Sequence, residues 1–263
     1  MRSRVLTDDD LRDLAVAQGI PLEWAERDYL LVSIAAGLEE AFPGQLCFKG
    51  GFVLRHVYGH SRFSQDVDST RQAPAHHKLD QAAVAGVIQA AGRPLFRVRK
   101  VVAATDSERS LDFDKIHYRG PIGDGDVSVE VSYREAIQVP SVPLPVGPPY
   151  YDAFDLPTMA PREMAAEKLR TLAQRRRPRD LLDAGMLFTG LAGPIDDADV
   201  AALIPVKFSP GLVWPGNHAE RIRTNVTMMA RTFDVAVHAV MQHPPAYEPM
   251  ARAVLSRLDR LFR

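Results

Sequence analysis

The middle of this chain changes from a helical to an alternating hydrophobic period, and this change limits the folds open to it. Three consecutive segments, "LFRVRKVVAAT", "SLDFDKIHYRG" and "DVSVEVSYRE", alternate in polarity and are rich in β-branched and aromatic residues. This pattern predicts three strands joined by short turns, the last being the glycine-rich "PIGDGD". Segments with helical periodicity precede and follow them, so we expect the α+β class, with a small mixed sheet and a helical domain behind it.

Helix start and stop signals divide the rest of the chain. Residues 7–42 predict two helices, the first running from an N-cap at Thr7 or a following Asp to Gly19, and the second starting at Pro21. The many prolines of residues 139–161 predict a linker or an extended wrap. Four parts are therefore expected: N-terminal helices packed on the core (1–44), an α/β core (45–140), a proline-rich linker (141–160) and a helical C-terminal domain (161–263).

Composition excludes several classes of protein. The chain has 263 residues and a net charge of −1, so any surface for nucleic acid must come from local charge segregation. Its single cysteine, Cys47, allows no internal disulfide and favours the reducing cytoplasm or a cysteine-poor organism. No apolar run approaches a membrane span, and "MRSRVLTDDD" lacks the apolar region of a signal peptide. We therefore expect a cytoplasmic protein with no membrane partner.

Two carboxylates, Asp66 and Asp68, occupy the short predicted strand "DVDST". Side chains at i and i+2 of a strand point to the same face, where two carboxylates repel each other unless a cation or proton lies between them. Such a pair supplies part of the oxygen shell that Mg²⁺ prefers, beside substrate phosphates. The alternative is a solvated strand end.

Glu130 strengthens the metal interpretation. It lies on the polar face of "DVSVEVSY", where an acidic side chain is costly if it is buried and unpaired. If this strand lies beside the strand that carries Asp66 and Asp68, Glu130 completes a cluster of three carboxylates. Such a cluster can hold two metal ions for in-line phosphoryl transfer. One alternative is that this face of the sheet is exposed to solvent. Another is that Asp126 or Glu135, rather than Glu130, is the third carboxylate beside Asp66 and Asp68.

Gly50 and Gly51 precede a predicted helix after the buried segment "QLCF". Glycine lets the backbone approach a ligand closely, and backbone N–H groups in such a turn can bind an anion. Lys49 could add a charge and Ser64 a hydroxyl to a phosphate site, although each has a structural explanation as a solvated side chain or a turn cap. Arg62 could pair with a phosphate or with a carboxylate.

The segment "EKLRTLAQRRRPRDLLDAG" combines basic and acidic groups. Lys168 lies on the apolar side of its predicted helix and could reach a triphosphate or extend to the helix edge. Asp180 begins the next helix, and Asp183 lies one turn later. A dense basic patch suits an RNA backbone, or else complements the helix dipole: Arg175, Arg176, Arg177 and Arg179.

Taken in order, "KGGFVLRHVYG", "RFSQDVD", the acidic strand residue and "EKLRTLAQRRRPRDLLD" resemble the AbiEii-type nucleotidyltransferase toxins of type IV toxin–antitoxin systems, which include the MenT toxins. The resemblance covers about residues 45–185. It implies a DNA polymerase β-like core, an NTP substrate and Mg²⁺ or Mn²⁺. It also implies a cognate antitoxin encoded nearby and transfer to RNA, with the 3′ acceptor end of tRNA as the expected site.

The resemblance also implies roles for particular residues. Phosphate would be held by Lys49, Gly50, Gly51 and Ser64, and metal by Asp66 and Asp68, with Glu130 added from strand parity. Lys168 would contact the triphosphate, and Asp180, or Asp183 in its place, would be the second catalytic acid. The usual "KGGTAL" appears here as "KGGFVL", so Phe52 offers no hydroxyl to a phosphate. The alternatives are transfer to a protein or small molecule, and an inactive nucleotide-binding module.

Overall fold

The computed structural model describes residues 6–72, 78–146, 154–209 and 211–262, and the chain forms two compact units. Unit 1 comprises Met1–Val57, Phe63–Ile137 and Ser141–Thr158. Unit 2 comprises Tyr58–Arg62, Gln138–Pro140 and Met159–Arg263. Neither unit is therefore one continuous stretch of sequence. The division into the four parts 1–44, 45–140, 141–160 and 161–263 stays a prediction.

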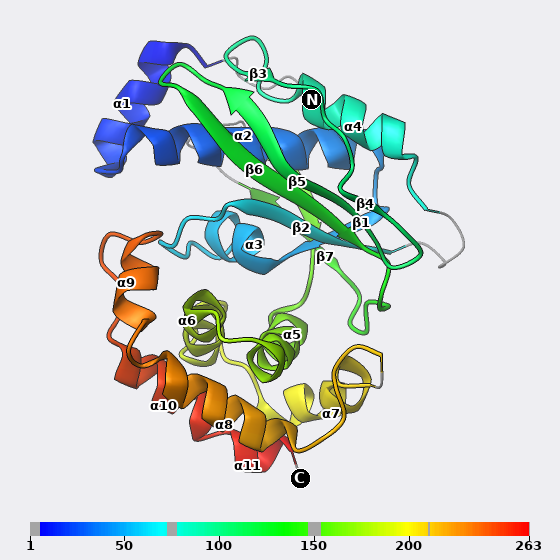
Figure 1. Cartoon of the computed structure of the whole chain (residues 1–263), viewed down its shortest axis with the longest axis vertical. Helices are drawn as coiled ribbons and strands as arrows, with labels where there is room; N and C mark the ends of the chain where they lie inside the picture. Colours follow the sequence, from blue (N-terminus) through cyan, green and yellow to red (C-terminus); the bar gives the residue numbers. More distant parts are fainter. Residues whose placement is uncertain (1–5, 73–77, 147–153, 210, 263) are drawn as a thin grey trace. The chain divides into compact units, whose positions relative to one another are not determined.

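Unit 1 is built on an eight-stranded mixed sheet with the strand order β3-β5-β6-β2-β1-β8-β7, and β4 also pairs with β5 (Figure 1). Strand β2 runs parallel to β6 and antiparallel to β1, while β1 runs parallel to β8. The strands are β1 (Leu46–Lys49), β2 (Asp66–Arg71), β3 (Arg97–Val98), β4 (Thr105–Asp106), β5 (Ser110–Arg119), β6 (Asp124–Ser132), β7 (Val142–Val146) and β8 (Phe154–Thr158). The helices are α1 (Asp8–Gln18), α2 (Leu22–Ala41), α3 (Gly50–His56) and α4 (Gln81–Ala90).

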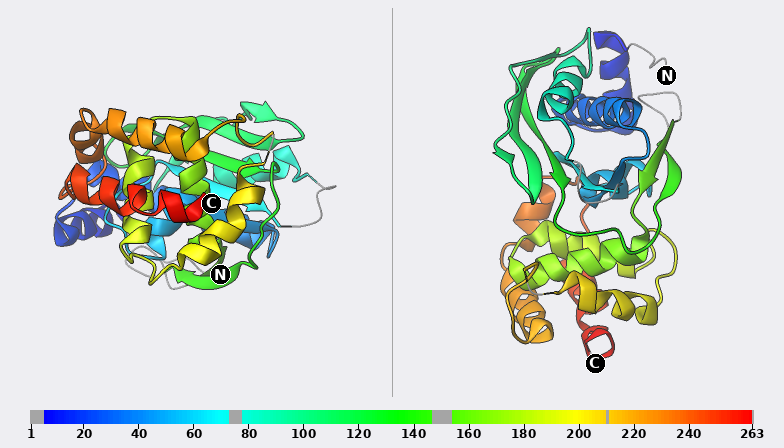
Figure 2. Two further views of the ribbon diagram at one scale, coloured as in Figure 1. Left: turned by 90° about the horizontal axis from the view of Figure 1, so that it is seen from below. Right: turned by 90° about the vertical axis from the view of Figure 1, so that its right-hand side faces the viewer.

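Local sequence signals explain the first two helices. Thr7 caps α1 in a reciprocal capping box with Asp10, and Gly19 ends the helix in the left-handed conformation. Pro21 stands directly before α2, as predicted. Helix α2 buries much of its surface and contacts β2, β6 and β8, so it forms the centre of the core of unit 1. The right-hand view of Figure 2 shows α2 on the concave side of the curved sheet.

The first of the three predicted central strands is formed only in part. Its segment pairs with β5 in two short pieces, β3 and β4, at the two ends of that strand. Between them, the ladder of β5 with β6 shifts register between Phe113 and Ile116, and Lys115 has a positive φ of 50°. A bulge of this kind interrupts regular pairing at a sheet edge, so the β-branched residues of the predicted strand have no continuous partner. The other two predicted strands are β5 and β6.

The proline-rich segment, predicted as a linker or an extended wrap, contains two strands. Strand β7 pairs antiparallel with β8, and β8 joins the sheet through Phe48 opposite Thr158. Pro143 and Pro145 lie in β7, which is the last strand in the sheet order. Proline lacks a backbone N–H and is tolerated at such an edge, where fewer hydrogen bonds are required.

Unit 2 is helical in its described residues. Its elements are α5 (Pro161–Gln174), α6 (Pro178–Phe188), α7 (Asp197–Lys207), α8 (His218–Met229), α9 (Phe233–His238), α10 (Tyr247–Leu255) and α11 (Leu258–Leu261). Lys207 is fully buried, with its Nζ 2.7 Å from Glu163 Oε1 and 3.0 Å from Glu167 Oε1. Glu163 also accepts hydrogen bonds from the backbone N–H groups of Gln138 and Val139, which holds that short segment in the unit. Among the described residues, no helix is both long and apolar enough to cross a membrane.

Candidate active site

The glycine pair lies directly against one of the predicted metal-binding carboxylates. Gly50 begins α3 with a φ of +68°, a conformation that residues with a Cβ rarely adopt. A Cβ built on Gly50 would lie 2.5 Å from Asp68 Oδ2. Lys49 at the end of β1 is the register partner of Asp68 on β2. Pairing of β1 with β2 therefore brings the turn and the carboxylate together, which is the proximity that a shared phosphate and metal site requires.

Asp66 and Asp68 start β2 and are both half-buried, whereas Val67 between them is fully buried. They therefore share the more accessible face of the strand, as the i, i+2 spacing predicts. The hydroxyl of Ser64 donates a hydrogen bond to the main-chain oxygen of Asp66, with an O···O distance of 3.1 Å. In this structure Ser64 thus orders the start of β2, and its contact with phosphate stays a prediction.

Glu130 lies beside Asp68, because the parallel pairing of β2 with β6 makes these two residues register partners. On its other side Glu130 is paired with Asp112 of β5. A row of three acidic residues thus crosses three neighbouring strands. Burial and then the charge of Asp68 raise the pKa of Glu130, whereas Arg134 and Lys49 lower it. Arg134 also forms an ion pair with Glu130.

The two alternatives to Glu130 have different surroundings: Asp126 lies away from the β2 pair, whereas Glu135 lies beside Lys49, the register partner of Asp68. Asp126 is an exposed residue of β6 whose carboxylate contacts the imidazole of His117. The register that pairs Asp66 with Ser128 leaves Asp126 beyond the end of β2. The carboxylate of Glu135 is nearly buried, and its Oε1 lies 4.0 Å from Lys49 Nζ. The structure therefore places Glu130, rather than Asp126, next to the β2 pair.

The carboxylates of Asp66, Asp68 and Glu130 could supply some, but not all, of the ligands that a hard cation needs. Neighbouring carboxylates such as Asp68 and Glu130 are stabilised by positive charge between them, and Mg²⁺ typically takes one or two carboxylates and completes its shell with phosphate and water. As the side chains stand, no group of three or more His, Cys, Asp or Glu residues in the described part of the chain could hold a metal ion. The set fits an ion that takes further ligands from a substrate. The three-carboxylate site of Asp66, Asp68 and Glu130 stays a prediction.

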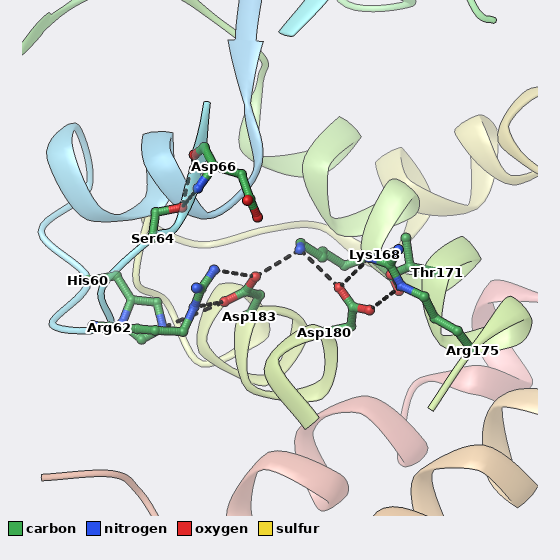
Figure 3. A network of polar contacts seen from close by, with 9 residues as sticks. All are labelled: His60, Arg62, Ser64, Asp66, Lys168, Thr171, Arg175, Asp180 and Asp183. Atoms are coloured by element: carbon green, nitrogen blue, oxygen red, sulfur yellow. Dashed lines mark hydrogen bonds and ion pairs between the residues drawn. The ribbon is translucent and has the colours of Figure 1, made fainter. Parts of the chain in front are cut away.

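A second cluster of charges lies within unit 2 and centres on Asp183, which is fully buried on α6 (Figure 3). Arg62 binds its carboxylate in a bidentate manner, with Nε donating to Oδ1 at 2.8 Å and Nη2 to Oδ2 at 3.0 Å. Lys168 Nζ of α5 lies 2.8 Å from Asp183 Oδ2 and 3.2 Å from Asp180 Oδ1. His60 Nε2 lies 4.0 Å from Asp183 Oδ1. The structure therefore joins Lys168 to both aspartates that the sequence left as alternatives.

The electrostatics of this cluster keep Asp183 and Lys168 charged. Burial alone would raise the pKa of Asp183, but Arg62 and Lys168 outweigh it and hold that pKa well below its usual range. Burial would likewise lower the pKa of Lys168, but the carboxylates of Asp183 and Asp180 raise it. Lys168 is thus a half-buried cation at neutral pH, because its counter-charges lie within hydrogen-bonding distance.

The four arginines predicted to bind RNA lie in and after the α5–α6 turn and have different surroundings. Helix α5 ends at Gln174, and Arg175 is extended and donates to Asp180 through Nε at 2.7 Å. Arg176 is exposed and donates from Nε to the Oδ1 of Asn225 at 3.0 Å. Arg177 is exposed and Arg179 is half-buried. Their binding of RNA stays a prediction.

Two features of these clusters were not anticipated. Asp112 alternates with Leu111 and Phe113 in "SLDFD", so strand parity alone could have placed it on the polar face. The bidentate pair of Arg62 with Asp183 joins residues 121 positions apart. No local pattern in the sequence indicates such a pair, although Arg62 was expected to bind a phosphate or a carboxylate.

Comparison with protein families identifies the group of proteins that the chain resembles. A family model described as "Nucleotidyl transferase AbiEii toxin, Type IV TA system" matches residues 35–214. This range contains the Gly50 turn, the acidic residues of β2 and β6, and the charge cluster around Asp183. Comparison with curated proteins gave no match.

Solved structures share the fold. MenT4, a nucleotidyltransferase toxin from Mycobacterium tuberculosis, aligns with a TM-score of 0.74 and 21% identity over 97% of this chain and 89% of its own. A putative nucleotidyltransferase from H. pylori aligns with a TM-score of 0.61 and 16% identity over 92% of this chain and 96% of its own. These similarities confirm the predicted α+β nucleotidyltransferase core and the helical C-terminal region.

Proposed function

We propose that this chain transfers nucleotides from an NTP to RNA. The premise is that it belongs to the AbiEii family of nucleotidyltransferase toxins from type IV toxin–antitoxin systems. The acceptor that we propose is the 3′ end of tRNA, where an added nucleotide would block aminoacylation and so stop translation and growth. The partners would be the NTP, the RNA and a cognate antitoxin, and the reaction would take place in the cytoplasm.

The contact of Gly50 with Asp68 carries this proposal. A backbone turn that can approach phosphates lies against a carboxylate that can hold a cation, and Asp66 and Glu130 are the neighbouring acids. Asp66, Asp68 and Glu130 would hold Mg²⁺, which when bound neutralises the charge of the transferring phosphoryl group. The main chain at Gly50 and Gly51, with Lys49 and Ser64, would hold the phosphates in line with the attacking hydroxyl.

For the second cluster we propose that Lys168 contacts the triphosphate. Its ammonium group carries three donors, and the ion pairs with Asp180 and Asp183 orient it. Arg62 would act as a positioning residue, because it holds Asp183 from the side opposite Lys168. Arg175, Arg176, Arg177 and Arg179 would guide the RNA backbone.

Labelled nucleotides distinguish the proposed acceptor from the alternatives. Purified protein is incubated with Mg²⁺, total tRNA and each α-labelled NTP in turn, with an EDTA control. We expect label on tRNA that EDTA abolishes. Label on protein or on a small molecule would contradict RNA as the acceptor. NTP binding without any transfer to RNA, protein or small molecule would favour an inactive nucleotide-binding module.

Gly50→Ala tests the role of the turn. A Cβ at this position would force Asp68 Oδ2 to move, and misplacement of a reacting group by about 1 Å costs about 100-fold in rate. We expect nucleotide transfer to fall by about that factor, measured as the initial rate of label incorporation. Gly44→Ala is the matched control, because Gly44 has a similar φ of +64° but nothing within 4 Å of the added Cβ. Equal loss of rate in the two variants would show that backbone strain, rather than the contact with Asp68, causes the effect.

A further inference from the structure

A cavity in unit 2 has the chemistry of a nucleotide-binding site and lies outside both clusters described above. It measures about 540 Å³ and is lined by the C-terminal end of α5, the loop before α8 and the first turns of α8. We propose that this cavity binds an unpaired nucleotide of the acceptor RNA, with its base stacked on Trp214. The inference rests on the proposed function, because it assumes an RNA acceptor.

Trp214 is 80% exposed, which is unusual for the largest apolar side chain. The loop that carries it is nevertheless held in place. Val213 is buried, and Arg221 of α8 donates from Nη1 to the carbonyl oxygen of Trp214 and from Nη2 to that of Pro215, both at 2.8 Å. An exposed indole on an anchored loop is a stacking platform, and base–aromatic stacking contributes about 1–3 kcal/mol per base.

The polar lining suits the phosphate of a nucleotide. Asn225 is oriented by two hydrogen bonds, since its Nδ2 donates to Leu172 O at 2.8 Å and its Oδ1 accepts from Arg176 Nε at 3.0 Å. This second bond holds the Arg176 guanidinium at the cavity, and guanidinium groups match phosphate geometry. Arg176 and Arg221 against Glu220 give the lining a net charge of +1. The exposed Arg177 extends this charge along the chain.

The size of the cavity favours a nucleotide over a protein partner. Aromatic and arginine side chains also anchor protein interfaces, but those need about 800 Å² of surface on each partner. Small-ligand sites measure about 300–1,000 Å³, a range that includes this cavity. Stacking without a base-specific donor set would accept any of the four bases, so we expect a preference for single strands and little preference for sequence.

RNA binding in the absence of NTP tests the inference separately from catalysis. The probe is a labelled ten-nucleotide single-stranded RNA, followed by fluorescence anisotropy. Trp214→Ala is expected to weaken binding by about tenfold, the equivalent of one stacked base, and Trp214→Phe to retain most of it. Val235→Ala is the matched control, because Val235 of α9 is also exposed, at 79%, and does not line the cavity.

A second readout does not depend on the stability of the alanine variant. The chain has two tryptophans, and Trp24 packs against Phe63 with ring centroids 4.5 Å apart. In a Trp24→Phe protein, Trp214 is the reporter, and single-stranded RNA should quench its fluorescence. Quenching by NTP alone at the same concentrations would assign the cavity to the NTP instead and overturn the inference.

The remaining outcomes separate this inference from the proposed function. If the wild-type protein labels RNA but Trp214→Ala binds the probe as tightly as wild type, the cavity assignment is wrong and the function stands. If the wild-type protein binds no RNA and labels another acceptor, the RNA acceptor and the cavity assignment are both wrong. Equal losses in Trp214→Ala and Val235→Ala would also overturn the assignment.

Discussion

Asp66→Asn is expected to lower nucleotide transfer by at least about 10³-fold, the scale on which a single charge acts at a transferring phosphoryl group. The substitution keeps the volume of the side chain and removes the negative charge that would hold a cation at the start of β2. The main chain of Asp66 keeps its hydrogen bond from Ser64, so β2 should still pair with β1 and β6. The measurement is the initial rate of label incorporation at saturating NTP, with thermal melting as a check of folding.

Asp126→Asn is the matched control for this experiment. Asp126 lies on β6 and carries the same charge, but it is exposed and pairs with His117. The Asp126→Asn variant should transfer nucleotides at a rate close to that of the wild-type protein. An Asp66→Asn rate within about tenfold of wild type would contradict a direct role for this carboxylate in transfer.

Asp183→Ala is expected to destabilise the helical unit by about 3–5 kcal/mol, the usual cost of removing one partner of a buried ion pair. The change would leave Arg62, which is almost fully buried, without its bidentate acceptor, and would remove the nearer of two carboxylates from Lys168. The measurement is the free energy of unfolding in urea. Asp199→Ala is the control, because Asp199 pairs with Arg162 at an exposed site, where such pairs contribute about 0–1 kcal/mol. If the free energy of unfolding fell by similar amounts in the two variants, the buried cluster would not stabilise the protein more than an exposed ion pair does.

The same cluster predicts a pH dependence. Arg62 and Lys168 lower the pKa of Asp183 in the folded protein, so its contribution to stability is present above the unfolded value of about 3.9. That contribution is lost as the pH falls below this value. The difference in unfolding free energy between the wild-type protein and Asp183→Asn should therefore be constant near neutral pH and shrink in acid. A difference that grew in acid would contradict the charged state assigned to Asp183.

The sequence predicted the features of the fold that are determined by residues close together along the chain. The caps at Thr7 and Gly19 follow from side-chain and backbone preferences of single residues, and both are confirmed. Strand parity placed Asp66 and Asp68 on one face, and the parallel pairing of β2 with β6 brings Glu130 beside Asp68. The prediction that these residues act together in catalysis is still to be tested by the variants above.

Long-range pairing explains what the sequence did not reveal. Strands β7 and β8 are rich in proline, which predicts a linker or an extended wrap, rather than paired strands, when each residue is considered by its own preference. Strand β7 pairs with the nearby β8, but the pair joins the sheet only through a partner far along the chain, where Thr158 lies opposite Phe48. The same holds for Arg62, which lies four residues before Asp66 and yet belongs to the helical unit. Hydrophobic periodicity carries no information on such an assignment.

The interleaving of the two units has a consequence for how this protein can be divided. A fragment that starts at Met159 contains Asp183 and Lys168 but lacks Tyr58–Arg62, and with it the guanidinium that binds Asp183. It also lacks Gln138–Pro140, whose backbone satisfies the buried Glu163. Recombination at a single breakpoint could therefore not exchange the complete helical unit between related proteins. Two short upstream segments, Tyr58–Arg62 and Gln138–Pro140, would have to be exchanged with it.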